Sequence, residues 1–177
     1  MANKFGGGAK TNFVGLQFEN NNSIKKDLEL AIKMATIKGV DLDPEDFVYK
    51  DGKRIGYFTQ KKQLYKKFLI GIDPYKVLSA TFEPDEAFIN EEQKIVYIIE
   101  KKFQHQYGTA DEKLQTCHFK LRQYTKIISL KNFKVRYIYF LSDWFKKDKY
   151  KDVLNYINEI GCEYYFNKIP FSTIGIF

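Results

Sequence analysis

Two short stretches of the sequence place carboxylates and amines beside apolar strand residues. One is the segment 83–86, "EPDE", and the other is Glu100-Lys101-Lys102, which follows the apolar run 95–99 without a break. Alternate residues of a strand share a face, so Glu100 and Lys102 project together while Lys101 points the other way. Apolar residues two and four positions before Glu100 share its face. The polar pair is therefore expected at the mouth of the core.

The chain between these stretches predicts a hairpin that brings a second carboxylate to Glu100. A turn centred on Glu92-Gln93 aligns Asp85 directly opposite Glu100, with a Cβ separation of roughly 4.5–5.5 Å. Two facing carboxylates repel each other unless positive charge offsets them. Carboxylates completed by waters suit Mg²⁺, which commonly binds through one or two carboxylates together with substrate phosphate. The sequence therefore predicts a magnesium site, with Mn²⁺ as a substitute, beside Lys102.

Metal-assisted phosphodiester hydrolysis requires a cation, an activated water and positive charge at the transition state. Lys102 could hold or deprotonate the attacking water, or stabilise the charge that develops on phosphorus. A simpler interpretation also fits, because Glu and Lys on one strand face are commonly a surface ion pair and short motifs arise by chance. The residues alone leave both interpretations open.

The elements that must position these residues follow from periodicity and turn signals. At 177 residues the chain fits one domain with a substantial core. Apolar spacing predicts a broken or kinked helical region at about 13–38 with Ser23 as N-cap, and Asp51-Gly52 predicts a hairpin. The further expected elements are strands at 77–89, 94–103, 135–141 and 162–166 and helices at about 110–129 and 148–160. This order predicts an α/β fold, a single domain with a central mixed β-sheet flanked by helices.

The charge balance favours an anionic partner. Lys and Arg outnumber Asp and Glu by 29 to 22, a net charge of +7, which suits nucleic acid or an acidic membrane surface. The most basic segment is 50–67, where Asp51 is the one acid. Within a basic hairpin at about 45–72, these lysines either protect a solvated edge strand or contact phosphates.

The sequence gives no sign of membrane insertion or secretion. No apolar run approaches the ~20 residues of a membrane helix, and the first residues lack the apolar stretch of a signal peptide. Residues 1–11 are expected to be a flexible arm. Cys117 and Cys162 lack the spacing of a zinc site and are expected to be buried thiols. We expect a cytoplasmic protein with no membrane partner and no organic cofactor.

The motif residues resemble a known group of nucleases. Pro84-Asp85, a spacer with an apolar strand, and Glu100-Lys101-Lys102 are similar to the pattern of the PD-(D/E)xK nuclease superfamily. The order of helix, motif-bearing hairpin, helix and strand resembles its αβββαβ core. With its short length, its basic ribbon and the segments 7–19 and 100–116, the chain is most similar to a type II restriction endonuclease.

The resemblance implies roles for particular residues. Asp85 and Glu100 would be metal ligands assisted by the Lys101 carbonyl, Lys102 would be the catalytic lysine, and Glu19 would be the glutamate that many members carry on the first helix. The residues expected to contact DNA are Lys53, Arg54, Lys61, Lys62, Gln104, Lys113, Gln115 and Lys120.

Together these observations predict a prokaryotic Mg²⁺-dependent endonuclease that cuts double-stranded DNA at a short specific sequence and works as a homodimer. A structure-specific enzyme, such as a Holliday junction resolvase or a repair nuclease, is an alternative on the same core. A basic DNA-binding module without catalysis is the alternative from another functional class.

Overall fold

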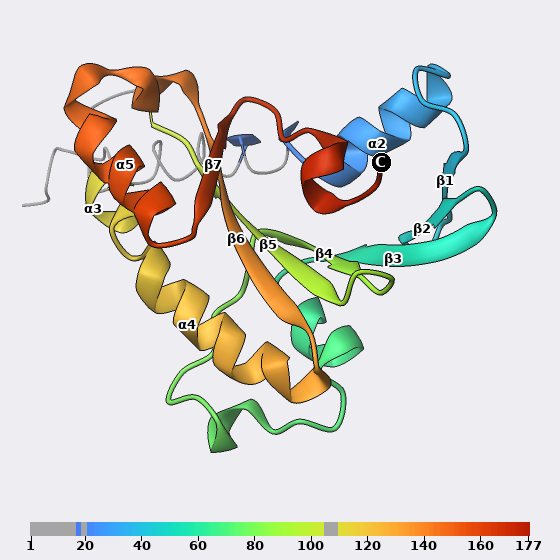
Figure 1. Cartoon of the computed structure of the whole chain (residues 1–177), viewed down its shortest axis with the longest axis horizontal. Helices are drawn as coiled ribbons and strands as arrows, with labels where there is room; N and C mark the ends of the chain where they lie inside the picture. Colours follow the sequence, from blue (N-terminus) through green and yellow to red (C-terminus); the bar gives the residue numbers. More distant parts are fainter. Residues whose placement is uncertain (1–16, 19–20, 105–109) are drawn as a thin grey trace, which may run out of the picture.

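The computed structural model describes residues 17–18, 21–104 and 110–177. In these ranges the chain forms a single α/β domain around a seven-stranded mixed sheet, whose strand order follows the chain (Figure 1). Neighbours from β1 to β5 are antiparallel, whereas β5, β6 and β7 are parallel. The strands are β1 (Val40–Leu42), β2 (Phe47–Lys50), β3 (Lys53–Thr59), β4 (Glu86–Asn90), β5 (Ile95–Lys102), β6 (Lys134–Leu141) and β7 (Glu163–Phe166). The predicted mixed sheet is confirmed.

Helices cover both faces of this sheet. α4 and α5 pack on one face, and α2 and the C-terminal turn η6 pack on the other (Figure 1). The α-helices are α2 (Ile24–Lys33), α3 (Ala110–Leu114), α4 (Cys117–Ile128) and α5 (Lys151–Glu159). The shorter helical turns are η1 (Leu64–Phe68), η2 (Pro74–Lys76), η3 (Ser129–Lys131), η4 (Asp143–Lys146), η5 (Asp148–Tyr150) and η6 (Phe171–Ile174). In the described ranges, no helix has both the length and the apolar character needed to span a lipid bilayer.

Strand β5 is buried on both faces because it lies between β4 and β6 with helices packed on each face of the sheet. Val96 and Ile98 belong to the core beneath α4, and Tyr97 and Ile99 belong to the core beneath α2. A strand covered on both faces has an almost continuous apolar sequence, which explains the run that precedes Glu100. The predicted alternation of faces therefore holds along this strand.

The segment before β4 differs from the prediction. A strand was expected from residue 77, but β4 begins at Glu86. Pro84 has no amide hydrogen to donate to a ladder, so the chain cannot continue regular pairing through it. The segment is fixed instead by Tyr65, whose hydroxyl donates to the Phe82 carbonyl at 2.8 Å and accepts from the Phe82 amide at 3.1 Å.

The helical predictions hold in part. Ser23 is the N-cap of α2, as predicted, and its Oγ accepts from the Lys26 amide at 3.4 Å. The helix ends at Lys33, before the predicted residue 38, and Ala35 follows with a φ of +52°. The helix predicted at 110–129 is two helices, α3 and α4. The Thr116 hydroxyl donates to the Lys113 carbonyl at the break between them, at 2.8 Å.

The basic segment 45–72 is only partly a hairpin. Asp51 and Gly52 form the predicted turn between β2 and β3, with φ angles of +50° and +76°, as a two-residue hairpin turn of this sequence requires. Beyond Thr59 the chain leaves the sheet and forms η1. The short edge strand β1 was not predicted. Cys117 and Cys162 are buried free thiols, as expected.

Gly56 lies where β3 approaches β4 closely, and its substitution tests this packing. A Cβ at this position would lie 2.1 Å from the Ile89 carbonyl oxygen, so we expect Gly56→Ala to lower the free energy of unfolding by about 1–3 kcal/mol, measured by urea denaturation. Gly52→Asn is the control, because Asn tolerates a positive φ and no atom lies within 4 Å of its Cβ position. Wild-type stability in Gly56→Ala would contradict this packing.

Candidate functional site

The β4–β5 hairpin brings the two predicted carboxylates together. Glu86 pairs with Ile99 and Asn90 with Ile95, so the next step of the register sets Asp85 across from Glu100, as predicted. Asp85 lies in a bend just before β4, and its Oδ2 accepts a hydrogen bond from the Lys101 amide at 2.8 Å.

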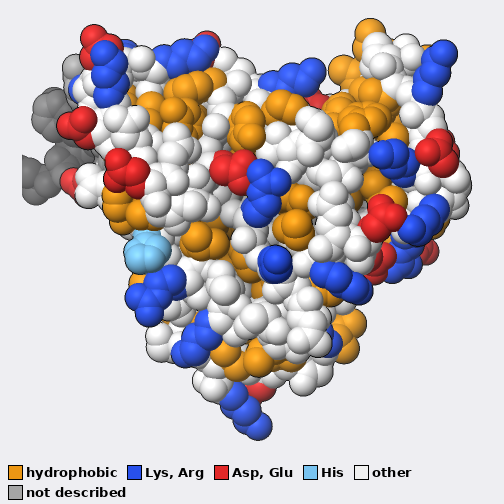
Figure 2. Space-filling view, viewed as in Figure 1, with side chains coloured by type: hydrophobic (Ala, Val, Ile, Leu, Met, Phe, Trp, Pro, Cys, Tyr) orange, Lys and Arg blue, Asp and Glu red, His pale blue; other side chains and the backbone are white. Residues whose placement is uncertain are grey.

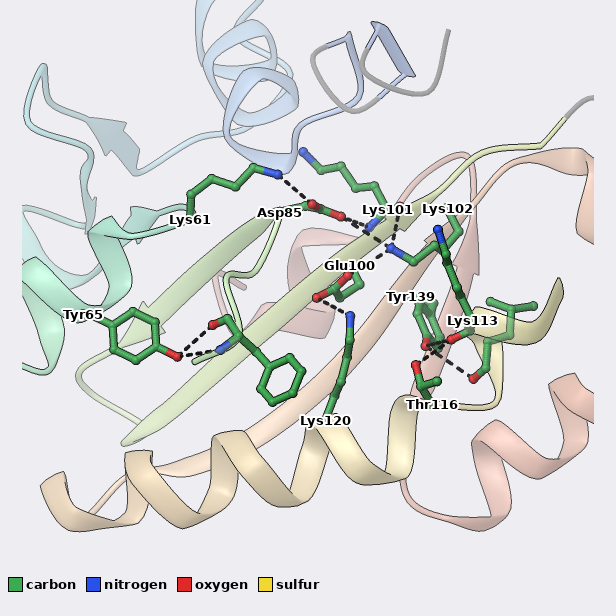
Figure 3. A network of polar contacts seen from close by, with 12 residues as sticks. Lys61, Tyr65, Asp85, Glu100, Lys101, Lys102, Lys113, Thr116, Lys120 and Tyr139 are labelled. Atoms are coloured by element: carbon green, nitrogen blue, oxygen red, sulfur yellow. Dashed lines mark hydrogen bonds and ion pairs between the residues drawn. The ribbon is translucent and has the colours of Figure 1, made fainter. Parts of the chain in front are cut away.

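Lys102 lies between the two carboxylates. Its Nζ is 3.0 Å from Glu100 Oε2 and 3.8 Å from Asp85 Oδ2 (Figure 3). The Lys102 ammonium also donates to the Lys101 carbonyl at 3.1 Å. All three side chains of the motif are mostly buried, with 5–16% of each side chain exposed. An ammonium so placed offsets the repulsion between the two carboxylates.

Two further lysines from distant parts of the chain complete the site. Lys61, which follows β3, places its Nζ 2.8 Å from Asp85 Oδ1, and Lys120 of α4 places its Nζ 3.1 Å from Glu100 Oε1. Figure 3 shows these ammoniums reaching the carboxylates from opposite sides. Among the described residues, three ammoniums thus face two carboxylates, a local excess of positive charge in these ranges that attracts an anion.

The Asp85 carboxylate is held in its charged form. Burial alone would raise its pKa, but the Lys102 charge, the Lys61 hydrogen bond and the Lys101 amide together outweigh burial. The net result is a pKa below the ordinary value of 3.8. Asp85 is therefore ionised and able to ligate a cation throughout the neutral pH range.

Tyrosines form the floor of the site. Tyr139 pairs with Glu100 in the parallel ladder, Tyr137 lies two residues before it, and Tyr124 comes from α4. Burial, and then the charge of Glu100, raise the pKa of Tyr124 and Tyr137 far above the ordinary range. Within the described ranges the Tyr124 hydroxyl is buried and has no hydrogen-bond partner. The floor is thus neutral, and its low polarity strengthens the ion pairs above it.

The loop that carries Asp85 is held by the segment after β3. The Lys61 amide donates to the Pro84 carbonyl at 2.8 Å, next to the Lys61–Asp85 ion pair. Lys61 has a φ of +48°, a conformation that is costly for a residue with a long side chain. Together with the Tyr65–Phe82 clamp, these contacts fix a loop that lacks strand pairing.

Lys101 connects the site to α2 on the opposite face of the sheet. Its Nζ is 2.9 Å from Glu86 Oε2, and both side chains are almost completely buried. Glu86 also accepts from the Ser23 hydroxyl at 3.0 Å and from the amides of Ile24 and Lys25 at 3.2 and 2.9 Å. Glu86 therefore caps α2, and this role directs it away from Asp85 and Glu100.

The donor atoms fit a magnesium ion that keeps several waters. Asp85, Glu100 and the Lys101 carbonyl offer oxygen atoms, the ligands that Mg²⁺ prefers. No group of three or more His, Cys, Asp or Glu in the described ranges could hold a metal ion, and this site supplies two carboxylates. Two carboxylates satisfy Mg²⁺ only when water or substrate phosphate completes the coordination sphere.

Two of the residues predicted to contact DNA lie away from this site. Lys53 and Arg54 begin β3 at the opposite end of the β4–β5 hairpin, where they bind Glu92 and Glu91 at 2.6 Å. Lys62, Lys113 and Gln115 are exposed. Gln104 is buried, and its backbone amide donates to Ser142 Oγ at 3.4 Å. Glu19, the glutamate predicted near the metal, lies outside the described residues.

The basic side chains are not gathered into one stripe on the face shown in Figure 2. Lys and Arg are spread over that face between apolar patches. The net charge of +7 therefore favours an anionic partner in general without marking a groove for it. The local surplus of charge at Asp85 and Glu100 is the more specific indication.

Comparisons with known proteins add no family assignment. No protein-family model, no curated protein and no solved structure matches the chain.

Removing Glu86 should destabilise the fold strongly. Glu86→Ala leaves the buried Lys101 ammonium without this carboxylate and the Ile24 and Lys25 amides of α2 without their acceptor, so we expect a loss of about 3–5 kcal/mol in the free energy of unfolding. The double variant Glu86→Gln, Lys101→Met removes both charges and should recover part of this loss, as measured by urea denaturation. Equal losses in the two variants would contradict a coupled buried pair.

The lowered pKa of Asp85 predicts the pH dependence of stability. A carboxyl with a lower pKa in the folded chain stabilises the fold above its unfolded pKa and loses that effect as pH falls through the folded value. The difference in the free energy of unfolding between wild type and Asp85→Asn should be constant from about pH 5 to 8 and should shrink below about pH 4. A stability difference between wild type and Asp85→Asn that grows on acidification would contradict a lowered pKa for Asp85.

Proposed function

We propose that this chain is a Mg²⁺-dependent endonuclease that hydrolyses phosphodiester bonds in double-stranded DNA. The observation that carries the proposal is the meeting of Asp85 and Glu100 at the end of the β4–β5 hairpin with the Lys102 ammonium between them, 3.0 and 3.8 Å from their oxygens. An ion pair on a wet surface would not need two nearly buried carboxylates.

Each residue has a role that its geometry suits. Asp85, Glu100 and the Lys101 carbonyl would hold the cation, which supplies Lewis-acid activation of water and of the phosphate. Hydrolysis joins the water oxygen to phosphorus and breaks the bond to one sugar oxygen, so negative charge grows on the phosphoryl oxygens. Lys102 is placed to orient the water and to stabilise that charge, because its ammonium lies beside the two carboxylates that would hold the cation.

The order of elements supports a PD-(D/E)xK assignment. α2, β3, β4, β5, α4 and β6 occur in the order of the αβββαβ core that the motif implies, with β1 and β2 added after α2 and α3 added before α4. The motif residues lie on β5 and in the bend before β4. The domain size and the motif favour a type II restriction endonuclease. A symmetric DNA sequence is most simply cut by a two-fold dimer, so we propose a homodimer.

One observation favours a second candidate, a DNA-binding protein without catalysis. Every carboxylate oxygen of Asp85 and Glu100 has a lysine ammonium or a backbone amide beside it. The negative charge of the two carboxylates is therefore compensated without a metal ion. A structure-specific nuclease, such as a junction resolvase or repair enzyme, remains the alternative that uses the same chemistry.

Plasmid cleavage distinguishes these candidates. Linear and supercoiled plasmid and a four-way junction are incubated with the protein and Mg²⁺, Mn²⁺ or EDTA. We expect discrete fragments with either metal and none with EDTA. Cleavage restricted to the junction would favour the structure-specific enzyme, and a band shift without cleavage would favour the binding protein.

Substitutions in the motif should abolish cleavage without unfolding the protein. We expect Asp85→Asn, Glu100→Gln and Lys102→Met each to reduce the cleavage rate by about 100-fold or more, as the loss of a group that stabilises the transition state does. Asp148→Asn and Lys126→Met are controls with the same changes of charge at exposed positions. Motif variants that cut like wild type would show that the catalytic site lies elsewhere.

A further inference from the structure

The four carboxylate oxygens of the site are already occupied by the chain's own groups. Lys61 and the Lys101 amide contact the two oxygens of Asp85 at 2.8 Å each. Lys120 and Lys102 contact the two oxygens of Glu100 at 3.1 and 3.0 Å. A cation that ligates these oxygens must therefore share them or displace a partner.

The three lysine partners differ in exposure, and the Lys102 side chain is the least exposed of them, at 16%. The Lys61 and Lys120 side chains are 49% and 22% exposed, whereas those of Asp85 and Glu100 are 11% and 5% exposed. The two ammoniums therefore cover the carboxylates on the side from which solvent and substrate arrive. The Lys101 amide belongs to the backbone of β5 and cannot withdraw without distorting the strand, whereas the Lys102 ammonium is also held by the Lys101 carbonyl at 3.1 Å.

The backbones of Lys61 and Lys120 are fixed, whereas their ammoniums are attached through flexible side chains. The Lys61 amide is bound to the Pro84 carbonyl at 2.8 Å, and Lys120 lies within α4, one turn before the buried Tyr124. Each ammonium can therefore move by side-chain rotation about a fixed point. A displaced ammonium remains within the length of one lysine side chain from the site.

A divalent cation and these ammoniums exclude each other by charge. Like charges only a few ångströms apart repel strongly near a buried carboxylate, because the local dielectric constant is low. The same ammoniums attract phosphate oxygens, whose negative charge can replace that of the carboxylate that each lysine leaves. The two states differ in which anion the lysine contacts.

On this geometry, and resting on the proposed nuclease function, we infer that Lys61 and Lys120 are exchangeable counter-ions. They neutralise Asp85 and Glu100 in the metal-free protein, leave these carboxylates when a divalent cation binds, and then bind the DNA phosphates next to the one that is cut. Metal binding and phosphate binding are thereby coupled. The wild-type protein holds metal weakly without DNA and more tightly with it.

Calorimetric titration with Mg²⁺ alone tests the exchange. Lys61→Met and Lys120→Met remove a competing charge but keep most of the side-chain volume, so each should bind Mg²⁺ at least about fivefold more tightly than wild type, a coupling of ordinary size. Lys67→Met and Lys126→Met make the same change of charge at exposed positions outside the site and should keep wild-type affinity. Glu100→Gln should abolish the binding and so locate it.

DNA binding should change in the opposite direction to Mg²⁺ binding in the same variants. With Ca²⁺ in place of Mg²⁺, Lys61→Met and Lys120→Met should bind duplex DNA more weakly than wild type, with a salt dependence lowered by about one phosphate contact each. Lys61→Gln and Lys120→Gln provide a second replacement, and thermal melting verifies that each variant is folded.

The outcomes separate this inference from the nuclease proposal. Metal affinity unchanged or weakened in the lysine variants, with Mg²⁺-dependent cutting in the wild type, would refute the exchange and leave the nuclease standing. Tighter metal binding in both lysine variants with no cutting of any DNA would support the exchange and refute the nuclease. If neither the wild type nor the two lysine variants bind Mg²⁺ at a site that Glu100→Gln abolishes, and no DNA is cut, both proposals are wrong.

Discussion

Two carboxylates are buried side by side at the end of the β4–β5 hairpin, and the surrounding structure is arranged to tolerate their charge. Asp85 and Glu100 would repel each other, and removing them from water costs further free energy. Lys102, Lys61 and Lys120 offset this cost from three separate elements. The segment after β3, strand β5 and helix α4 each contribute one of these ammoniums.

Lys101 shows how one residue connects the two faces of the sheet. Its amide binds Asp85, its carbonyl accepts from Lys102, and its own ammonium binds Glu86 on the other side. The α2 helix is therefore attached to the same strand that carries the candidate catalytic groups. A disturbance of the α2 N-terminus would reach Asp85 through a single residue of β5.

Much of the central fold could be predicted from the sequence, because strong local signals determine it. The alternation along β5 and the Asp51-Gly52 turn depend on neighbours in the chain, and the hairpin register depends on one turn. The strand expected before Glu86 was wrong because the apolar residues there pack against the core from a loop, which periodicity does not distinguish from a strand.

The site was predictable only as far as its motif. Lys61 and Lys120 were predicted to contact DNA, but their contact with the carboxylates depends on tertiary packing that no local pattern encodes. Lys53 and Arg54 were grouped with Lys61 by composition, although the antiparallel pairing of β3 with β4 puts the start of β3 at the far end of the hairpin. Tyr124 and Tyr137 gave no signal beyond that of core aromatic residues.

The register of the β4–β5 hairpin has a consequence for how this chain tolerates changes in length. A single residue inserted into the turn 91–94 would move every later side chain of β5 to the opposite face if pairing were kept. Lys101 would then stand beside Asp85, and Glu100 would face the Glu86 carboxylate and the N-terminus of α2. A change of two residues would preserve the faces and shift only the pairing. This turn should therefore vary in sequence but not by single insertions or deletions.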